Sequence, residues 1–127
     1  MSVRSISAKR LKVVYADDDE LIRSTVINAL IEEGIEVHSC ADGADVLELC
    51  GLVDPDAVLL DLNMPVIGGM EAARRLRRDG RNAALRIVAM TGQGSWELRR
   101  EAMEAGFDEF LVKPAGIASL LKALDPS

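Results

Sequence analysis

The chain has 127 residues, 49% of them hydrophobic, and a formal net charge of −6 at pH 7. That length supports one domain with its own core, and the acidic balance argues against direct binding to nucleic-acid phosphates. No apolar run is long enough to span a bilayer, and residues 1–10 lack the apolar middle of a signal peptide. We therefore predict a cytoplasmic protein without membrane association, whose residues 1–10 form a short tail.

The predicted secondary structure alternates strands and helices along the chain. Apolar runs without alternation indicate strands covered on both faces, and apolar residues three and four apart indicate helices. Asp, Ser, Gly and Pro mark where these elements begin and end. In chain order the predicted elements are a strand at 11–16, a helix at 19–34, a strand at 35–39, a helix at 42–52, a strand at 58–61, a helix at 70–79, a strand at 85–90, a helix at 95–106, a strand at 108–112 and a helix at 117–124. This pattern predicts an α/β fold with a doubly wound parallel five-stranded sheet and right-handed crossovers.

The sequence also predicts the exposure or role of several side chains within these elements. His38 falls on the polar side of an alternating edge strand and is expected to be exposed, without a metal or catalytic role, because no second ligand lies nearby. Trp96 is either a core residue or a partly exposed partner contact. Ile117 and the leucines that follow it at i+3, i+4 and i+7 indicate a last short helix. The arginines crowded within residues 74–81 indicate a solvated helix face, with partner docking as the alternative.

The two cysteines, Cys40 and Cys50, have neither CxxC spacing nor a neighbouring histidine cluster. This spacing favours a packing role over zinc binding or redox chemistry.

Polar side chains stand where the apolar strands end. Asp61 closes the most apolar run, and Pro65 with the Gly68-Gly69 pair prevents that run from continuing. Asp61 is therefore expected at the carboxyl end of its strand, the edge where open α/β sheets bind ligands. Taken alone, Asp61 is explained equally well as a turn cap. The other strands, apart from the second, bring to the same edge Asp17, Asp18, Thr91 and Lys113.

This set of side chains indicates phosphoryl chemistry. Three carboxylates at one edge raise each other's pKa, so the cluster calls for a cation, and Mg²⁺ prefers oxygen ligands. Asp61 is the best nucleophile because it is central, whereas Asp17 and Asp18 are adjacent and suit a metal. The ammonium of Lys113 and the hydroxyl of Thr91 would stabilise a phosphoryl group on Asp61.

The order and spacing of these residues resemble the receiver domain of the two-component response-regulator family, as in chemotaxis regulators. The matching residues are the pair Asp17-Asp18, the turn Asp61-x-x-Met64-Pro65, Thr91 and Lys113-Pro114. The resemblance implies a flavodoxin-like (βα)5 fold with strand order 2-1-3-4-5, a receiver domain over residues 11–124 and a C-terminal tail at 125–127. It also implies a Mg²⁺ cofactor and a histidine kinase or histidine phosphotransfer protein as partner.

The resemblance further implies a role for the residues around the acidic cluster. Asp61 is the phosphoacceptor. Direct metal contacts come from Asp18, Asp61 and the backbone carbonyl of Asn63, with Asp17 acting largely through water. Asn63 and Gln93 stand where side chains tune attack of water on the aspartyl phosphate, and we expect these two polar residues to permit hydrolysis.

In the same family, Thr91 and the aromatic at Phe110 form a coupled switch. Phosphorylation draws the hydroxyl inward, the aromatic follows, and the surface of the last two helices and the last strand changes its affinity for partners. This sequence departs from the usual pattern in two places. Phe110 lacks the hydroxyl of the tyrosine often found there, and Gly68 replaces an acid, which is expected to loosen the loop.

Two other function classes remain as alternatives. Asp17-Asp18-Asp19 is compatible with the DxD motif of a haloacid-dehalogenase-like phosphatase, but Leu21 stands where that family has a hydroxyl residue or valine, and the chain is short for enclosing a substrate. A phosphorylation-independent scaffold is the second alternative, disfavoured because buried unused charge is costly. We predict no enzyme, only a phosphoacceptor that assists its own phosphotransfer and dephosphorylation. With no effector segment in the sequence, either a stand-alone regulator or the receiver of a larger protein is expected.

Overall fold

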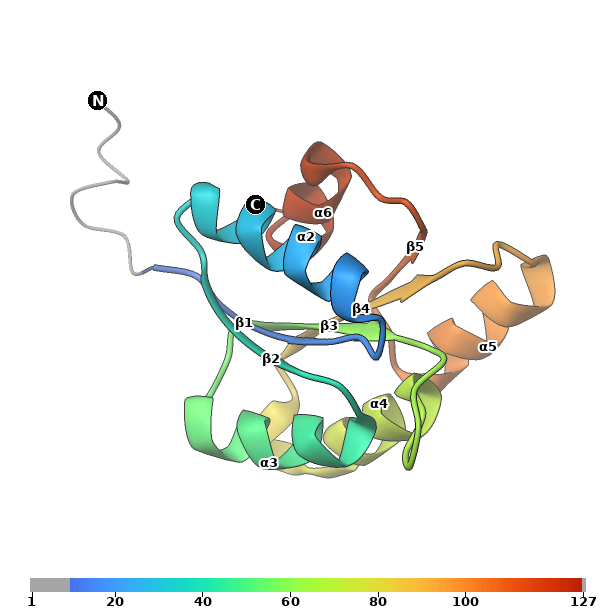
Figure 1. Ribbon diagram of the computed structural model, residues 1–127. Helices are drawn as coiled ribbons and strands as arrows, with labels where there is room; N and C mark the ends of the chain where they lie inside the picture. Colours follow the sequence, from blue (N-terminus) through green and yellow to red (C-terminus); the bar gives the residue numbers. More distant parts are fainter. Residues whose placement is uncertain (1–9, 127) are drawn as a thin grey trace.

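A central parallel sheet lies between two layers of helices in the computed structural model, which describes residues 10–126 (Figure 1). The elements are β1 (Lys12–Ala16), α2 (Glu20–Glu32), β2 (Glu36–Cys40), α3 (Gly43–Val53), β3 (Ala57–Asp61), α4 (Gly69–Arg78), the 3₁₀ helix η1 (Gly80–Asn82), β4 (Arg86–Thr91), α5 (Trp96–Ala105), β5 (Glu109–Val112) and α6 (Ile117–Leu124). Every predicted strand and helix is present. Residues 1–9 of the predicted N-terminal tail and residue 127 lie outside the described residues, so the tails and domain limits stay predictions.

The strand order is β2-β1-β3-β4-β5, and all four strand pairs are parallel. This confirms the predicted flavodoxin-like topology. All five residues of β3 are buried, because β1 and β4 flank it and helices cover both of its faces. The β2 strand lies at the edge of the sheet and is only partly buried, as its alternating sequence predicts.

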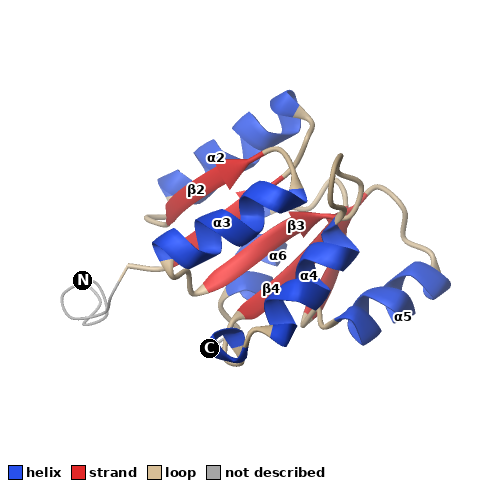
Figure 2. Ribbon diagram, turned by 90° about the horizontal axis from the view of Figure 1, so that it is seen from below, coloured by secondary structure: helices blue, strands red, loops and turns tan. Residues whose placement is uncertain are grey.

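The helices divide between the two faces of the sheet. Helices α3, α4 and α5 cover one face, and α2 and α6 cover the other (Figures 1 and 2). Alternate residues of a strand point to opposite faces, so Val14 of β1 packs into the core under α3 and α4, whereas Tyr15 packs into the core under α2 and α6. The longest helix, α2, has 13 residues. Within residues 10–126, no helix has the length and apolar character that crossing a membrane requires.

Helix caps and side-chain exposure test several sequence expectations. The Asp19 carboxylate accepts a hydrogen bond from the Ile22 backbone N–H at 3.0 Å, which confirms Asp19 as the N-cap of α2. Trp96 is 78% exposed, which excludes the core position and leaves the exposed one of its two predicted alternatives. The His38 side chain keeps 36% of its surface exposed and lies 2.8 Å from Glu36 on the same face of β2. His38 is thus only partly exposed, because this neighbour covers it.

The last helix, α6, lies where the helical spacing from Ile117 predicts it, and its side chains differ in exposure. Ile117 is 37% exposed, whereas Leu120, Ala123 and Leu124 are almost fully buried. Ile117 is the first residue of α6, which begins soon after β5 ends at the carboxyl edge of the sheet. Helical spacing thus predicts the helix but not the greater exposure of its first residue.

Both cysteines are free thiols packed into the core under α3 and α4. Burial raises the pKa of the Cys50 thiol to about 12 and that of Cys40 to about 11. Protonated, buried thiols are poor nucleophiles and poor metal ligands, which agrees with the predicted packing role.

The arginines of α4 do not all lie on its solvated face. Arg74, Arg75 and Arg78 are exposed and surround Glu71, with N–O distances of 3.7, 3.0 and 3.7 Å. Arg77 instead turns toward the carbonyls of neighbouring elements and keeps only 25% of its side chain exposed. The prediction of a solvated arginine face therefore holds for three of these side chains and fails for Arg77.

Candidate functional site

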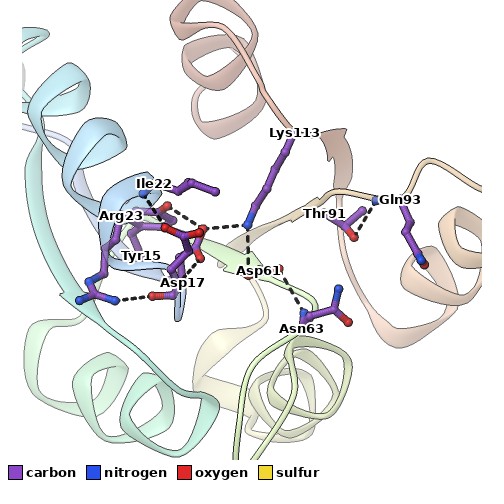
Figure 3. Close-up of polar contacts among 10 residues, drawn as sticks. Tyr15, Asp17, Ile22, Arg23, Asp61, Asn63, Thr91, Gln93 and Lys113 are labelled. Atoms are coloured by element: carbon purple, nitrogen blue, oxygen red, sulfur yellow. Dashed lines mark hydrogen bonds and ion pairs between the residues drawn. The ribbon is translucent and has the colours of Figure 1, made fainter.

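Asp61 lies where the sequence predicts, at the carboxyl end of β3, and is 4% exposed. Its Oδ1 accepts a hydrogen bond from the Asn63 backbone N–H at 3.1 Å, and its Oδ2 accepts one from Lys113 Nζ at 3.1 Å (Figure 3). The loop after β3 returns closely to this strand end: a Cβ on Gly69 would lie 2.5 Å from the Asp61 carbonyl oxygen. Only glycine fits at this approach, which holds the start of α4 against the site.

The first residue after β1, Asp17, is completely buried. Its Oδ1 accepts a hydrogen bond from the Asp19 backbone N–H at 3.0 Å. Its Oδ2 accepts one from the Tyr15 hydroxyl at 3.0 Å and lies 3.0 Å from Lys113 Nζ. Asp17 is therefore held on both oxygens, in contrast to its exposed neighbour Asp18.

The three acids predicted to gather at this edge do so. One carboxylate oxygen each from Asp17, Asp18 and Asp61 lies within 4.8 Å of the other two. A cluster of three carboxylate oxygens suits a hard divalent cation such as Mg²⁺, which takes oxygen ligands. The donor set therefore fits the predicted metal.

The end of β5 supplies Lys113. Its backbone N–H donates to the Thr91 carbonyl at 2.7 Å, which fixes it beside the end of β4. Its ammonium reaches across the sheet edge to both Asp17 and Asp61 (Figure 3). Burial lowers the pKa of Lys113, but the hydrogen bonds and charges of the two carboxylates outweigh burial, so the pKa is raised. Lys113 is thus a charged bridge between two acids.

A family model described as "Response regulator receiver domain" matches residues 13–125. The chain belongs to this family. Response regulator MprA of Mycobacterium sp. strain KMS is 34% identical over 111 residues, which cover 87% of this chain and 47% of that protein. MprA of Mycobacterium leprae strain TN is 33% identical, covering 87% and 48%. The receiver domain described here thus spans about half the length of the curated relatives it matches.

Solved structures give the same result for the fold. The chemotaxis response regulator CheY4 of Vibrio cholerae superposes with a TM-score of 0.86 at 32% identity, covering 93% of this chain and 98% of that chain. The receiver domain of sensor histidine kinase PA1611 from Pseudomonas aeruginosa PAO1 has a TM-score of 0.85 at 24% identity, covering 93% and 97%, and shows the fold alone.

The surroundings of the Asp61 carboxyl in this receiver domain shift its pKa. Burial raises its pKa, the Asn63 N–H and the Lys113 ammonium lower it, and the charge of Asp17 raises it again. The net direction is upward. An acid whose pKa is higher in the folded than in the unfolded state stabilises the fold only at low pH, and that stabilisation is lost as pH rises through the folded pKa.

Replacing Asp61 with asparagine is therefore expected to stabilise the metal-free domain. We expect Asp61→Asn to raise the free energy of unfolding by roughly 0.5–2 kcal/mol at neutral pH in EDTA, the range common for single stabilising substitutions. Urea unfolding followed by circular dichroism measures this. The gain should shrink as the pH falls into the usual Asp range. Glu48→Gln, which removes an exposed charge from α3, is the control, and a less stable Asp61→Asn would contradict the argument.

The two residues of the predicted switch are both buried. Thr91 ends β4 with no exposed surface, and its Oγ1 accepts a hydrogen bond from the Gln93 backbone N–H at 3.3 Å. Phe110 on β5 is 5% exposed and pairs with Ala89, two residues before Thr91, so Thr91 and Phe110 face the same side of the sheet. The Arg99 guanidinium carbon lies 6.0 Å from the Phe110 ring centroid. The coupling of this pair to phosphorylation stays a prediction.

Sequence reasoning missed two residues that hold Asp17. The Tyr15 hydroxyl bonds its carboxylate, and the Arg23 guanidinium donates to its backbone carbonyl at 2.6 Å. For Tyr15 a signal existed: it is the polar-tipped residue in an apolar strand, two positions before Asp17 and so on the same face. For Arg23 the helical spacing from Asp17 gave no specific indication.

Proposed function

We propose that this receiver domain is a phosphorylation-activated signalling module that accepts a phosphoryl group on Asp61. The donor is a phosphohistidine on a partner histidine kinase or histidine phosphotransfer protein, in the cytoplasm. One observation carries the proposal: a buried carboxylate at the central strand end is approached by the Lys113 ammonium and lies within a cluster of three acids. Neither the phosphatase nor the scaffold alternative has a comparable observation in its favour.

The proposed transfer makes specific demands on these side chains. A carboxylate oxygen of Asp61 attacks phosphorus, a P–O bond forms, and the P–N bond to the donor imidazole breaks. Lys113 already lies against Asp61 Oδ2, so its ammonium is placed to neutralise charge on the incoming phosphoryl group.

A metal is part of the proposal. Asp18 and Asp61 would hold Mg²⁺ directly together with the Asn63 backbone carbonyl, and Asp17 would hold it largely through water. Bound there, Mg²⁺ supplies positive charge for the phosphoryl oxygens. The PA1611 receiver domain, which shares this fold, has a magnesium ion coordinated in its active site cleft. The side chains of Asn63 and Gln93, both exposed at this edge, would tune attack of water on the aspartyl phosphate.

The proposed output follows from the switch pair. Once Asp61 carries a phosphoryl group, the Thr91 hydroxyl is free to donate to it, Phe110 follows into the space, and the surface of α5, β5 and α6 changes. Thr91 and Phe110 lie on the same side of the sheet, which supports this coupling. The three elements expose apolar side chains that a protein partner could cover, namely Trp96, Met103, Val112 and Ile117.

The test is covalent modification of the protein. Incubated with Mg²⁺ and acetyl phosphate, the parent should gain the mass of one phosphoryl group, and EDTA or Asp61→Asn should abolish that gain. Asp45→Asn, which removes an exposed acid from α3, should leave it unchanged. A Mg²⁺-dependent adduct that persists in Asp61→Asn would overturn the assignment of Asp61. Turnover of unrelated phosphate esters unaffected by Asp61→Asn would favour the phosphatase.

A further inference from the structure

Tyr15, inside the buried strand β1, places a hydroxyl beneath the acidic site. Its side chain has no exposed surface, and its ring packs in the core under α2 and α6 with Leu30 and Leu59. The hydroxyl donates to Asp17 Oδ2 at 3.0 Å (Figure 3). A phenylalanine would fill the same core volume, so packing alone does not explain the hydroxyl. Its partner is the acid that the cluster buries most deeply.

The hydrogen bonds of Asp17 leave its carboxylate little freedom. A carboxylate offers about four acceptor positions. Three are taken, by the Asp19 N–H on Oδ1 and by the Tyr15 hydroxyl and the Lys113 ammonium on Oδ2. Arg23 fixes the backbone of the same residue. One acceptor position therefore remains on a carboxylate that has an oxygen within 4.8 Å of carboxylate oxygens of the other two acids.

The contribution of Tyr15 differs from that of Lys113. Lys113 divides its ammonium between Asp17 and Asp61, and the proposed phosphoryl transfer needs that same ammonium at Asp61. The Tyr15 hydroxyl, in contrast, donates its hydrogen bond to Asp17 alone. Burial, followed by the charge of Asp17, raises the pKa of Tyr15 far above its usual range, so the phenol remains a donor at all working pH values.

We propose that Tyr15 is a positioning residue of the magnesium site, which holds the Asp17 carboxylate in the orientation that receives the hydrated ion. The inference rests on the proposed function, since it concerns the same metal site. Partners that orient a ligand in this way commonly change metal affinity by about 10–100-fold when removed. Tyr15 acts through Asp17, the residue to which its hydroxyl donates.

Calorimetric titration of the full chain with Mg²⁺ tests this. Tyr15→Phe, which keeps the ring, should raise the Kd for Mg²⁺ about tenfold. In the Asp17→Asn background the same change should have no further effect, because the carboxylate through which Tyr15 acts is gone. Thr25→Val, which removes an exposed hydroxyl bonded to the Leu21 carbonyl on α2, is the matched control and should leave the Kd unchanged.

The outcomes separate the two proposals. A parent that binds Mg²⁺ while Tyr15→Phe binds it equally well would overturn the role of Tyr15 and leave the proposed function standing. An equal loss of affinity in the parent and Asp17→Asn backgrounds would also overturn it, because Tyr15 would then act by another route. A parent that does not bind Mg²⁺ would overturn the metal site itself.

A second measurement needs no substitution. Tyr15 is the single tyrosine of the chain, so biosynthetic 3-fluorotyrosine labels this position alone. Its ¹⁹F resonance should shift during Mg²⁺ titration with the same midpoint as the calorimetric curve. A resonance that stays fixed while the ion binds would show that the phenol does not sense the site, and would overturn the proposal even if Tyr15→Phe folds poorly.

Discussion

Replacing Lys113 with methionine is expected to lower the free energy of unfolding by about 3 kcal/mol at neutral pH in EDTA. The methionine keeps an apolar stem of similar length but removes the ammonium that lies 3.0 Å from Asp17 and 3.1 Å from Asp61. Both acids are buried, so two carboxylates would then face each other without a compensating charge. Urea unfolding followed by circular dichroism measures the loss.

The pH dependence of this loss has a definite sign. The pKa of Asp61 is already raised in the folded parent, and removing Lys113 would raise it further. The folded variant then binds a proton that the unfolded chain releases, so its stability is present below the usual Asp range and is lost as pH rises through the folded pKa. The deficit of Lys113→Met should therefore be largest at neutral pH and should shrink in acid.

Two comparisons separate this electrostatic effect from a packing effect. Lys122→Met, which removes an exposed ammonium from α6, should change stability by no more than about 0.5 kcal/mol. Adding Asp61→Asn to Lys113→Met should restore part of the loss, because one of the facing charges disappears. If the loss is the same at all pH values and survives Asp61→Asn, Lys113 stabilises the domain by packing alone.

The fold could be predicted because its signals are local. The fully apolar sequence of β3 indicates a strand covered on both sides, and Asp19 and Ser95 mark helix starts that the structure confirms by their side-chain caps. The acidic cluster followed from the same reasoning. Once strands are parallel, the residues after them meet at one edge, so Asp17 and Asp61 had to approach each other.

Most of what sequence reasoning missed depends on contacts between distant elements. Tyr15 is a partial exception, because its place two residues before Asp17 indicates the shared face but not the hydrogen bond that its hydroxyl donates to the Asp17 carboxylate. Ile117 shares the helical spacing of Leu120 and Leu124, yet it is 37% exposed whereas they are buried. Arg77 shares a helix with exposed arginines, and only the packing of α4 beside α5 turns it inward. None of these outcomes is encoded in residue spacing along a single element.

Replacing Arg77 with methionine should cost roughly 2–3 kcal/mol of stability, because partly buried carbonyls and a carboxylate lose a charged donor. The guanidinium joins the end of α4 to three other segments. Its Nε donates to the Gly106 carbonyl at 2.9 Å, its Nη1 to the Leu85 carbonyl at 2.7 Å and the Asn82 carbonyl at 3.2 Å, and its Nη2 to Asp108 at 2.7 Å. Urea unfolding of Arg77→Met measures this loss.

The neighbouring Arg78 supplies a matched control on the same helix. Its side chain is 67% exposed and its contact with Glu71 is 3.7 Å long, so Arg78→Met should change stability by no more than about 0.5 kcal/mol. Equal losses in the two variants would show that the Arg77 contacts contribute little.

Arg77→Met should also lower the stability of the domain without changing Mg²⁺ binding or phosphoacceptance at Asp61. Leu85, which accepts from Arg77, immediately precedes β4 and so lies at the amino edge of the sheet, whereas Asp61 ends β3 at the carboxyl edge. A folded Arg77→Met protein should therefore bind Mg²⁺ and accept a phosphoryl group as the parent does, while Lys113→Met should lose both stability and phosphoacceptance. Loss of phosphoacceptance in folded Arg77→Met would mean that the Arg77 network also supports the opposite edge of the sheet.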